Sequence, residues 1–131
     1  MKRTGINPWP WSEKLGFDQA HLVENPRREL ICSVQDAVDA SGTPQHPGDM
    51  AAQLGLALDN LQAVLADADM TLANVVRLNI YTTDVDTLRQ HFAVLTKRFE
   101  GGRERFASSV LGVARLLSPQ LLVALEATAM D

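Results

Sequence analysis

The chain has 131 residues, of which 46% are hydrophobic and 21% are charged, and its formal net charge is −4. This length fits one domain, so we expect a single domain over residues 1–131 that buries a core without disulfides or metal. The acidic balance argues against nucleic acid as a partner, because nucleic-acid domains usually carry a concentrated basic stripe. The pairs Arg27-Arg28 and Lys97-Arg98 are too short and too far apart to form one.

The sequence also argues against membrane insertion and against a metal site. No run approaches the roughly 18 apolar residues of a membrane span, and the N-terminus lacks the continuous apolar segment of a signal peptide. The single Cys32 cannot form an intrachain disulfide, so we expect a cytoplasmic location. His21, His46 and His91 show no paired spacing, so we expect no metal and no cofactor.

The first part of the chain predicts two strands. Two prolines within residues 8–11 predict an extended segment there. Residues 17–23 and 30–34 read as strands separated by a turn. Residues 36–48 contain glycine and proline breakers and are predicted to form a loop.

The middle of the chain predicts a long helix and a strand. Apolar residues recur at steps of three and four from Met50 to Ala68, which is typical of an amphipathic helix, and Asp49 suits its N-terminus. Residues 76–81 then alternate between apolar and polar, as in a strand.

The C-terminal part predicts one more helix and two strands. A helix capped by residues 84–86, with a buried stripe from Leu88 to Phe99, should end at Gly101-Gly102. Strands are predicted over residues 109–115 and 121–129.

This order predicts an α+β fold with one mixed sheet. Each helix joins two strands, and right-handed crossovers place both helices on the same face of the sheet. In the last strand, Leu121, Val123 and Leu125 point one way and Leu122 and Ala124 the other, so both faces are apolar. Since helices cover only one face, we expect self-association through the other.

Several segments in this order resemble the Rid proteins (reactive intermediate deaminases, YjgF-like). The matching segments lie at 46–53 and 58–61, at Tyr-Thr-Thr-Asp 81–84, at Val-Ala-Arg-Leu 113–116 and at Glu-Ala-Thr-Ala 126–129. The similarity covers nearly the whole chain. It implies a chorismate-mutase-like fold and a trimeric, barrel-like assembly, a homotrimer with a small-molecule cleft at each subunit interface.

The resemblance also implies a chemistry that this chain departs from. Most members of the family hydrolyse enamines and imines such as 2-aminoacrylate, clamping the substrate carboxylate with an arginine and activating water with a glutamate. The matching positions hold Ser108 and Ala124. A serine hydroxyl cannot make the bidentate charged contact of an arginine.

Other cleft positions implied by the resemblance are changed too. Phe17 replaces a tyrosine, Ser33-Val34-Gln35 replaces Ser-Gly-Gln, and Phe92 replaces an asparagine. The full set implied for the ligand cleft is Phe17, Ser33, Val34, Phe92, Ser108, Ser109 and Ala124. Polar contributors could be Gln35, Arg105 and Glu126, although an odd offset of three from Ser108 points Arg105 to the opposite strand face.

These observations favour a small-molecule cleft that does not act as a 2-aminoacrylate deaminase. A site rich in apolar groups and hydroxyls suits a ligand without a carboxylate. One alternative is an enamine or imine hydrolase, or a biosynthetic tailoring enzyme, with an altered substrate. A further alternative is an endoribonuclease, a label that family members often carry and that the acidic charge argues against.

Overall fold

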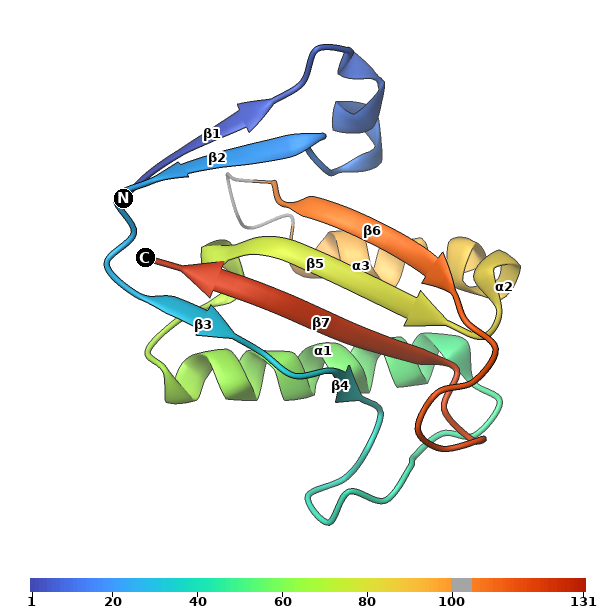
Figure 1. The fold of residues 1–131 in the computed structure, drawn as a ribbon. Coiled ribbons are helices and arrows are strands. Elements are labelled where there is room, and N and C mark those ends of the chain that lie inside the picture. Colours follow the sequence, from blue (N-terminus) through green and yellow to red (C-terminus); the bar gives the residue numbers. More distant parts are fainter. Residues whose placement is uncertain (100–104) are drawn as a thin grey trace.

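The computed structural model describes residues 1–99 and 105–131, and its centre is a mixed β-sheet (Figure 1). β7 pairs antiparallel with β3, β4 and β5, and β5 pairs in parallel with β6 at the sheet edge. The five strands are β3 (Glu29–Ile31), β4 (Gln35–Asp36), β5 (Val75–Thr82), β6 (Ala107–Gly112) and β7 (Val123–Met130).

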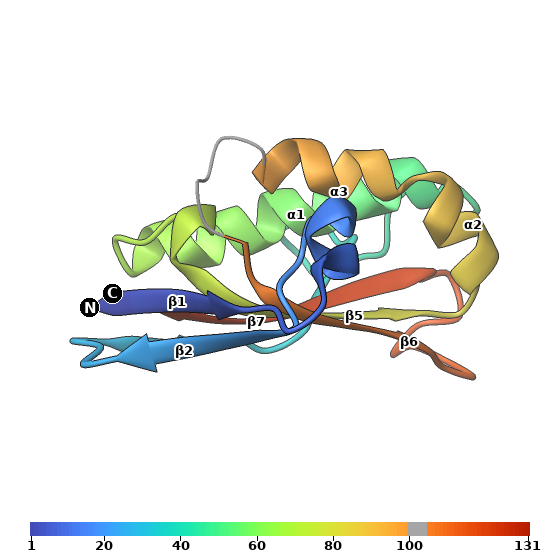
Figure 2. The ribbon, with the colours of Figure 1, turned by 90° about the horizontal axis from the view of Figure 1, so that it is seen from above.

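The helices all lie on one face of this sheet (Figure 2). They are α1 (Met50–Asp67), α2 (Val85–Gln90) and α3 (Phe92–Phe99), with a 3-10 turn, η2 (Leu72–Asn74), ahead of β5. The predicted α+β fold with helices on one face is therefore confirmed. The predicted second helix is in two pieces, because the backbone leaves the helical conformation at His91, and the predicted stop at Gly101-Gly102 lies outside the described residues.

The core forms between α1 and the strands β5 and β7. The predicted leucine stripe of α1 is fully buried, and it packs with the inward side chains of the two strands. Burying one such leucine stabilises the fold by roughly 1.5–3 kcal/mol. Asp49 caps α1 by accepting a hydrogen bond from Ala52 N at 3.0 Å. None of the helices in the described ranges combines the length and the apolar content that crossing a bilayer requires.

The N-terminal part differs most from the sequence prediction. It forms a separate antiparallel pair, β1 (Lys2–Ile6) with β2 (Ala20–Glu24), joined through a 3-10 helix, η1 (Pro10–Leu15). The extended segment predicted for 8–11 is wrong from Pro10 onward, because proline at the first position of a helix fits the helical φ and loses no hydrogen bond. We call residues 1–24 the N-terminal hairpin, and Asp18 joins it to β6 by a bridge to Ala107.

The outward face of β7 is more polar than predicted. The strand begins at Val123, and Leu122, expected on the outward face, packs against the core instead. Strand alternation then places Ala124, Glu126 and Thr128 on the face away from the helices. Large exposed apolar side chains include Val110 and Leu111 in β6 and Leu117 in the segment after β6, which is 95% exposed.

Candidate functional site

A cavity of about 520 Å³ opens beside β5 and β7, and we call it the sheet cavity. Its volume falls in the range of roughly 300–1,000 Å³ typical of small-molecule sites. Tyr81 and Ala124, which are register partners on the outward face of the sheet, form its floor. Its other lining residues come from the segment around β4 (Ser33, Val34, Asp36) and from the segment after β6 (Val113, Arg115, Leu116, Leu117).

The sheet cavity contains three of the residues implied for the ligand cleft. Ser33, Val34 and Ala124 come from separate parts of the chain and meet there because β4 pairs with β7. Gln35 does not line the cavity, and its side chain donates to the carbonyl of Ser33 at 3.2 Å.

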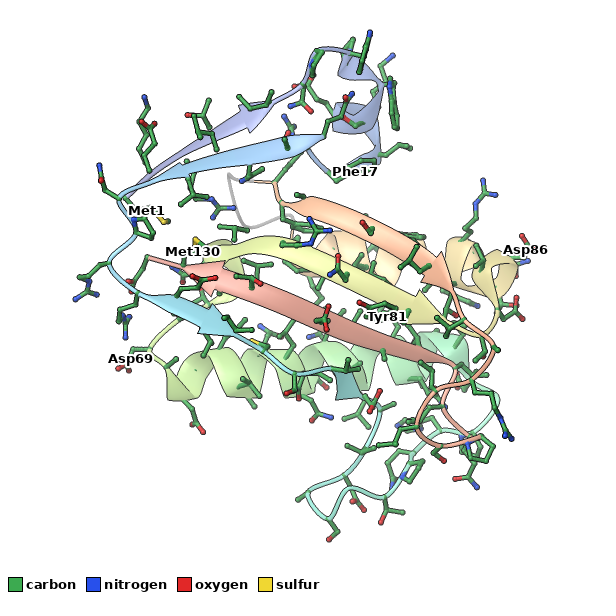
Figure 3. The ribbon with its side chains drawn as sticks, viewed as in Figure 1. Met1, Phe17, Asp69, Tyr81, Asp86 and Met130 are labelled. Carbon is green, nitrogen blue, oxygen red and sulfur yellow. The ribbon has the colours of Figure 1, made fainter. Side chains whose placement is uncertain are left out.

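The remaining implied residues lie elsewhere in the subunit. Ser108 is the register partner of Leu78, so its side chain shares the helix-covered face, whereas Ser109 pairs with Asn79 and faces outward. Phe17 lies beside the start of β6 (Figure 3). Its ring packs edge-on against that of Trp11, with the ring centroids 5.9 Å apart. Phe92, on α3, packs against the core.

Tyr81 contributes a hydrogen-bonded hydroxyl to the sheet cavity. Its hydroxyl donates to Glu126 Oε1 at 2.9 Å, and Asn79 Nδ2 donates to the same oxygen at 3.0 Å. The bonds from Asn79 and Tyr81 lower the pKa of Glu126, and the bond to Glu126, together with burial, raises the pKa of Tyr81. At neutral pH the pair is therefore a carboxylate that accepts from a neutral phenol.

Two charged side chains also line the sheet cavity. Burial raises the pKa of Asp36, which has no ionic partner among the described residues. Arg115 is exposed and likewise forms no ion pair with any described residue. The sequence prediction named Gln35, Arg105 and Glu126 as possible polar contributors and missed both Asp36 and Arg115, although Arg115 lies inside the matched Val-Ala-Arg-Leu segment.

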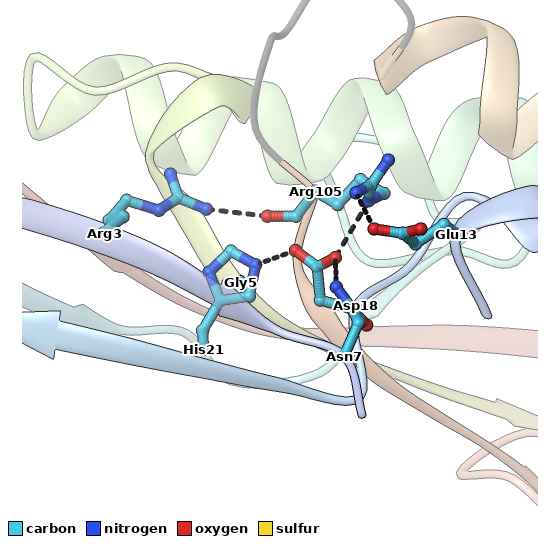
Figure 4. Close-up of a pocket in the computed structure, with 7 residues that line it drawn as sticks. All are labelled: Arg3, Gly5, Asn7, Glu13, Asp18, His21 and Arg105. Atoms are coloured by element: carbon cyan, nitrogen blue, oxygen red, sulfur yellow. Dashed lines mark hydrogen bonds and ion pairs between the residues drawn. The ribbon is translucent and has the colours of Figure 1, made fainter. Parts of the chain in front are cut away.

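A second, smaller cavity of about 230 Å³ lies between the N-terminal hairpin and β6 (Figure 4). At its centre the buried Asp18 carboxylate accepts from Asn7 at 2.7 Å, from His21 Nε2 at 2.6 Å and from Arg105 Nε at 2.9 Å. Arg105 also binds Glu13 at 3.1 Å. We call these five residues the Asp18 cluster.

The Asp18 cluster joins the hairpin to the sheet. In it, the carboxylates of Asp18 and Glu13 bind the guanidinium of Arg105. Burial opposes the ionisation of Asp18, but the hydrogen bonds from Asn7, Arg105 and His21 outweigh it, so the pKa of Asp18 lies below its ordinary value. The two cavities share no lining residue. Within the subunit, Arg105 therefore does not serve the sheet cavity.

Among the described residues there is neither a metal-binding cluster nor an exposed cysteine. No group of three or more His, Cys, Asp or Glu among them could hold a metal ion. Cys32 is buried, and burial raises the pKa of its thiol, which disfavours the reactive thiolate.

Comparisons with known proteins agree with this fold. The family model described as Endoribonuclease L-PSP matches residues 19–131. YyfB from Yersinia pestis, described as a protein of unknown function of the conserved Rid family, is 35% identical, with full coverage of both chains and a TM-score of 0.88. A member of the YjgF/YER057c/UK114 family from Mycobacterium tuberculosis is 28% identical, covering 99% of this chain and 100% of its own, with a TM-score of 0.66. No curated protein was found to match significantly.

Proposed function

The chain belongs to the Endoribonuclease L-PSP family as a Rid-family protein with the chorismate-mutase-like fold, and from this premise we propose that it is a homotrimer that binds a small molecule at each subunit interface. Turnover of that molecule would be modest. A single domain over residues 1–131 and a cytoplasmic location are parts of the same proposal.

The observation that carries the proposal is the sheet cavity, which lies on the face without helices. It holds Ser33, Val34 and Ala124, three of the seven residues implied for the ligand cleft. Phe17 and Ser108 lie toward the β6 edge and the helix-covered face of the same subunit. A second copy that packed its β6 edge against the uncovered face would bring its own Phe17, Phe92 and Ser108 toward the sheet cavity and complete the cleft.

The proposed cleft lacks both groups that the family's usual deamination needs. Ser108 replaces the arginine, and a charged hydrogen-bonded contact of that kind is worth about 1.5–3 kcal/mol. Ala124 replaces the glutamate, and a general base contributes about 10²–10⁴ in rate. Arg105 does not compensate in the subunit, because Asp18 and Glu13 hold its guanidinium.

The activity test uses 2-aminoacrylate, generated in situ by a dehydratase, with pyruvate release as the readout. We expect the wild-type protein to accelerate the release little or not at all. The double variant Ser108→Arg with Ala124→Glu restores both groups, so it should exceed the wild type. Acceleration by the wild-type protein equal to that of an active family member would overturn the proposal.

The assembly is tested separately by sedimentation equilibrium. We expect a trimer at micromolar concentration. A stable monomer would contradict the shared cleft, because the sheet cavity would then stay without Phe17, Phe92 and Ser108 of a neighbour.

The alternative of an enamine or imine hydrolase with a changed substrate keeps the same cleft and differs only in turnover. It is favoured if the wild-type protein releases ammonia from an imine without a carboxylate. The endoribonuclease alternative would require RNA cleavage by the pure protein, which its net charge of −4 disfavours.

A further inference from the structure

The hydroxyl of Tyr81 has a fixed role as a hydrogen-bond donor within the sheet. A phenol has one proton to give, and here it is given to Glu126 Oε1 at 2.9 Å. Glu126 is ionised at neutral pH and cannot donate in return, because the bonds from Asn79 and Tyr81 lower its pKa. A hydrogen bond to a charged acceptor is stronger than one between neutral groups, so a neutral ligand does not divert this proton.

The direction of this bond decides what Tyr81 offers to a ligand. Tyr81 lines the sheet cavity next to its register partner Ala124, where the family's glutamate is missing. With its proton committed to Glu126, the phenol oxygen has only lone pairs left for a ligand. A ligand N–H placed there gains a hydrogen bond, and a ligand oxygen placed there meets an oxygen that cannot donate to it.

We infer that Tyr81, oriented by Glu126 and Asn79, is the specificity-determining residue of the sheet cavity and selects small molecules that present an N–H donor, such as an amide, amine or imine nitrogen. This inference rests on the proposed function, because it requires that the sheet cavity binds a ligand. Asn79 contributes by donating a second hydrogen bond to the same Glu126 oxygen, at 3.0 Å.

A matched pair of probes tests the inference without knowledge of the natural ligand. 2-Pyrrolidinone and γ-butyrolactone have the same ring size and carbonyl, but the first has an N–H where the second has a ring oxygen. Binding is followed on the full-length protein by titration of backbone amide NMR signals. We expect 2-pyrrolidinone to bind roughly fivefold more tightly, the effect of one neutral hydrogen bond, with shifts at residues of the sheet cavity.

The variants separate the hydroxyl from the cavity. Tyr81→Phe keeps the ring and removes the oxygen, so both probes should bind with similar affinity. Thr83→Val is the control, because it removes an exposed hydroxyl just after β5 that does not line the sheet cavity, and it should keep the preference of the wild type.

The outcomes distinguish this inference from the proposed function. Equal binding of the two probes to the wild type, tighter binding of the lactone, or a preference that survives Tyr81→Phe would overturn the role of Tyr81 and leave the cleft standing. Failure of both probes to shift any residue of the sheet cavity at high millimolar concentration would overturn the cleft and the inference together.

Discussion

Gly5 and Asp18 lie so close together that a side chain at position 5 has no room. A Cβ atom at Gly5 would lie 2.7 Å from Oδ2 and 2.9 Å from Cγ of Asp18. The glycine is therefore required by the carboxylate of the Asp18 cluster. Since that carboxylate binds Asn7, His21 and Arg105, the hairpin's attachment to the sheet depends on this contact.

Gly5→Ala should destabilise the protein by about 1–3 kcal/mol, because the new methyl group displaces the Asp18 carboxylate from its donors. The measurement is urea unfolding followed by circular dichroism, at one protein concentration for all variants. Gly55→Ala is the control: it lies inside α1, a Cβ there meets nothing within 4 Å, and alanine should stabilise the helix by about 0.5–1 kcal/mol. Equal stability of Gly5→Ala and wild type would mean that Asp18 is not held as described.

The Asp18 cluster should also make stability depend on acid. The pKa of Asp18 is lower in the folded than in the unfolded protein, so its contribution is fully present above the unfolded value, about 3.9, and is lost as pH falls through the folded value. We expect Asp18→Asn to be less stable than wild type at neutral pH. On acidification its free energy of unfolding should fall by less than that of the wild type. Unfolding by urea at a series of pH values gives both curves. Parallel curves for the two proteins would show that Asp18 has the same pKa in the folded and in the unfolded protein.

The parts of the fold that could be predicted are those where burial sets a repeating pattern. The leucine stripe of α1 and the alternation in β5 follow directly from contact with one core. The N-terminal hairpin has no such pattern, because most of its residues are exposed or half-buried and it is attached by polar contacts around Asp18. Its first strand, β1, was therefore not predicted.

The candidate site could be predicted only in part, because strand register decides which side chains meet. Ser33, Val34 and Ala124 were placed in the cleft by resemblance, and the structure brings them together. Tyr81 and Arg115 lie in segments that were matched to the family, but only the pairing of β5 with β7 and the course of the chain after β6 place them beside Ala124.

Gln53 should hold the segment before β7 in place. Its buried side chain donates to the carbonyls of His46 and Gln120, at 3.1 and 2.8 Å, and accepts from Leu122 N at 2.8 Å. Gln53→Leu leaves these three backbone groups without partners, so we expect a loss of about 2–4 kcal/mol in urea unfolding.

Gln90→Leu is the control for this change. Gln90 lies exposed at the end of α2 and its side chain has no hydrogen bond to any described residue, so its replacement should change stability by less than about 0.5 kcal/mol. Similar unfolding of the two variants would remove the structural role assigned to Gln53.

The bond between Tyr81 and Glu126 can be observed directly, because Tyr81 is the one tyrosine of the chain. Its ionisation changes the near-ultraviolet absorbance, so a pH titration reports this side chain alone. The hydrogen bond to Glu126, burial and the charge of Glu126 raise the pKa of Tyr81. Glu126→Gln removes the charge, so Tyr81 should ionise at lower pH than in the wild type, with circular dichroism confirming that both proteins remain folded.

Glu24→Gln, which removes a carboxylate paired with Lys2 on the hairpin, should leave the titration of Tyr81 unchanged. If Glu126→Gln leaves it unchanged as well, Glu126 does not hold the phenol proton, and the selection of N–H donors by Tyr81 loses its physical basis.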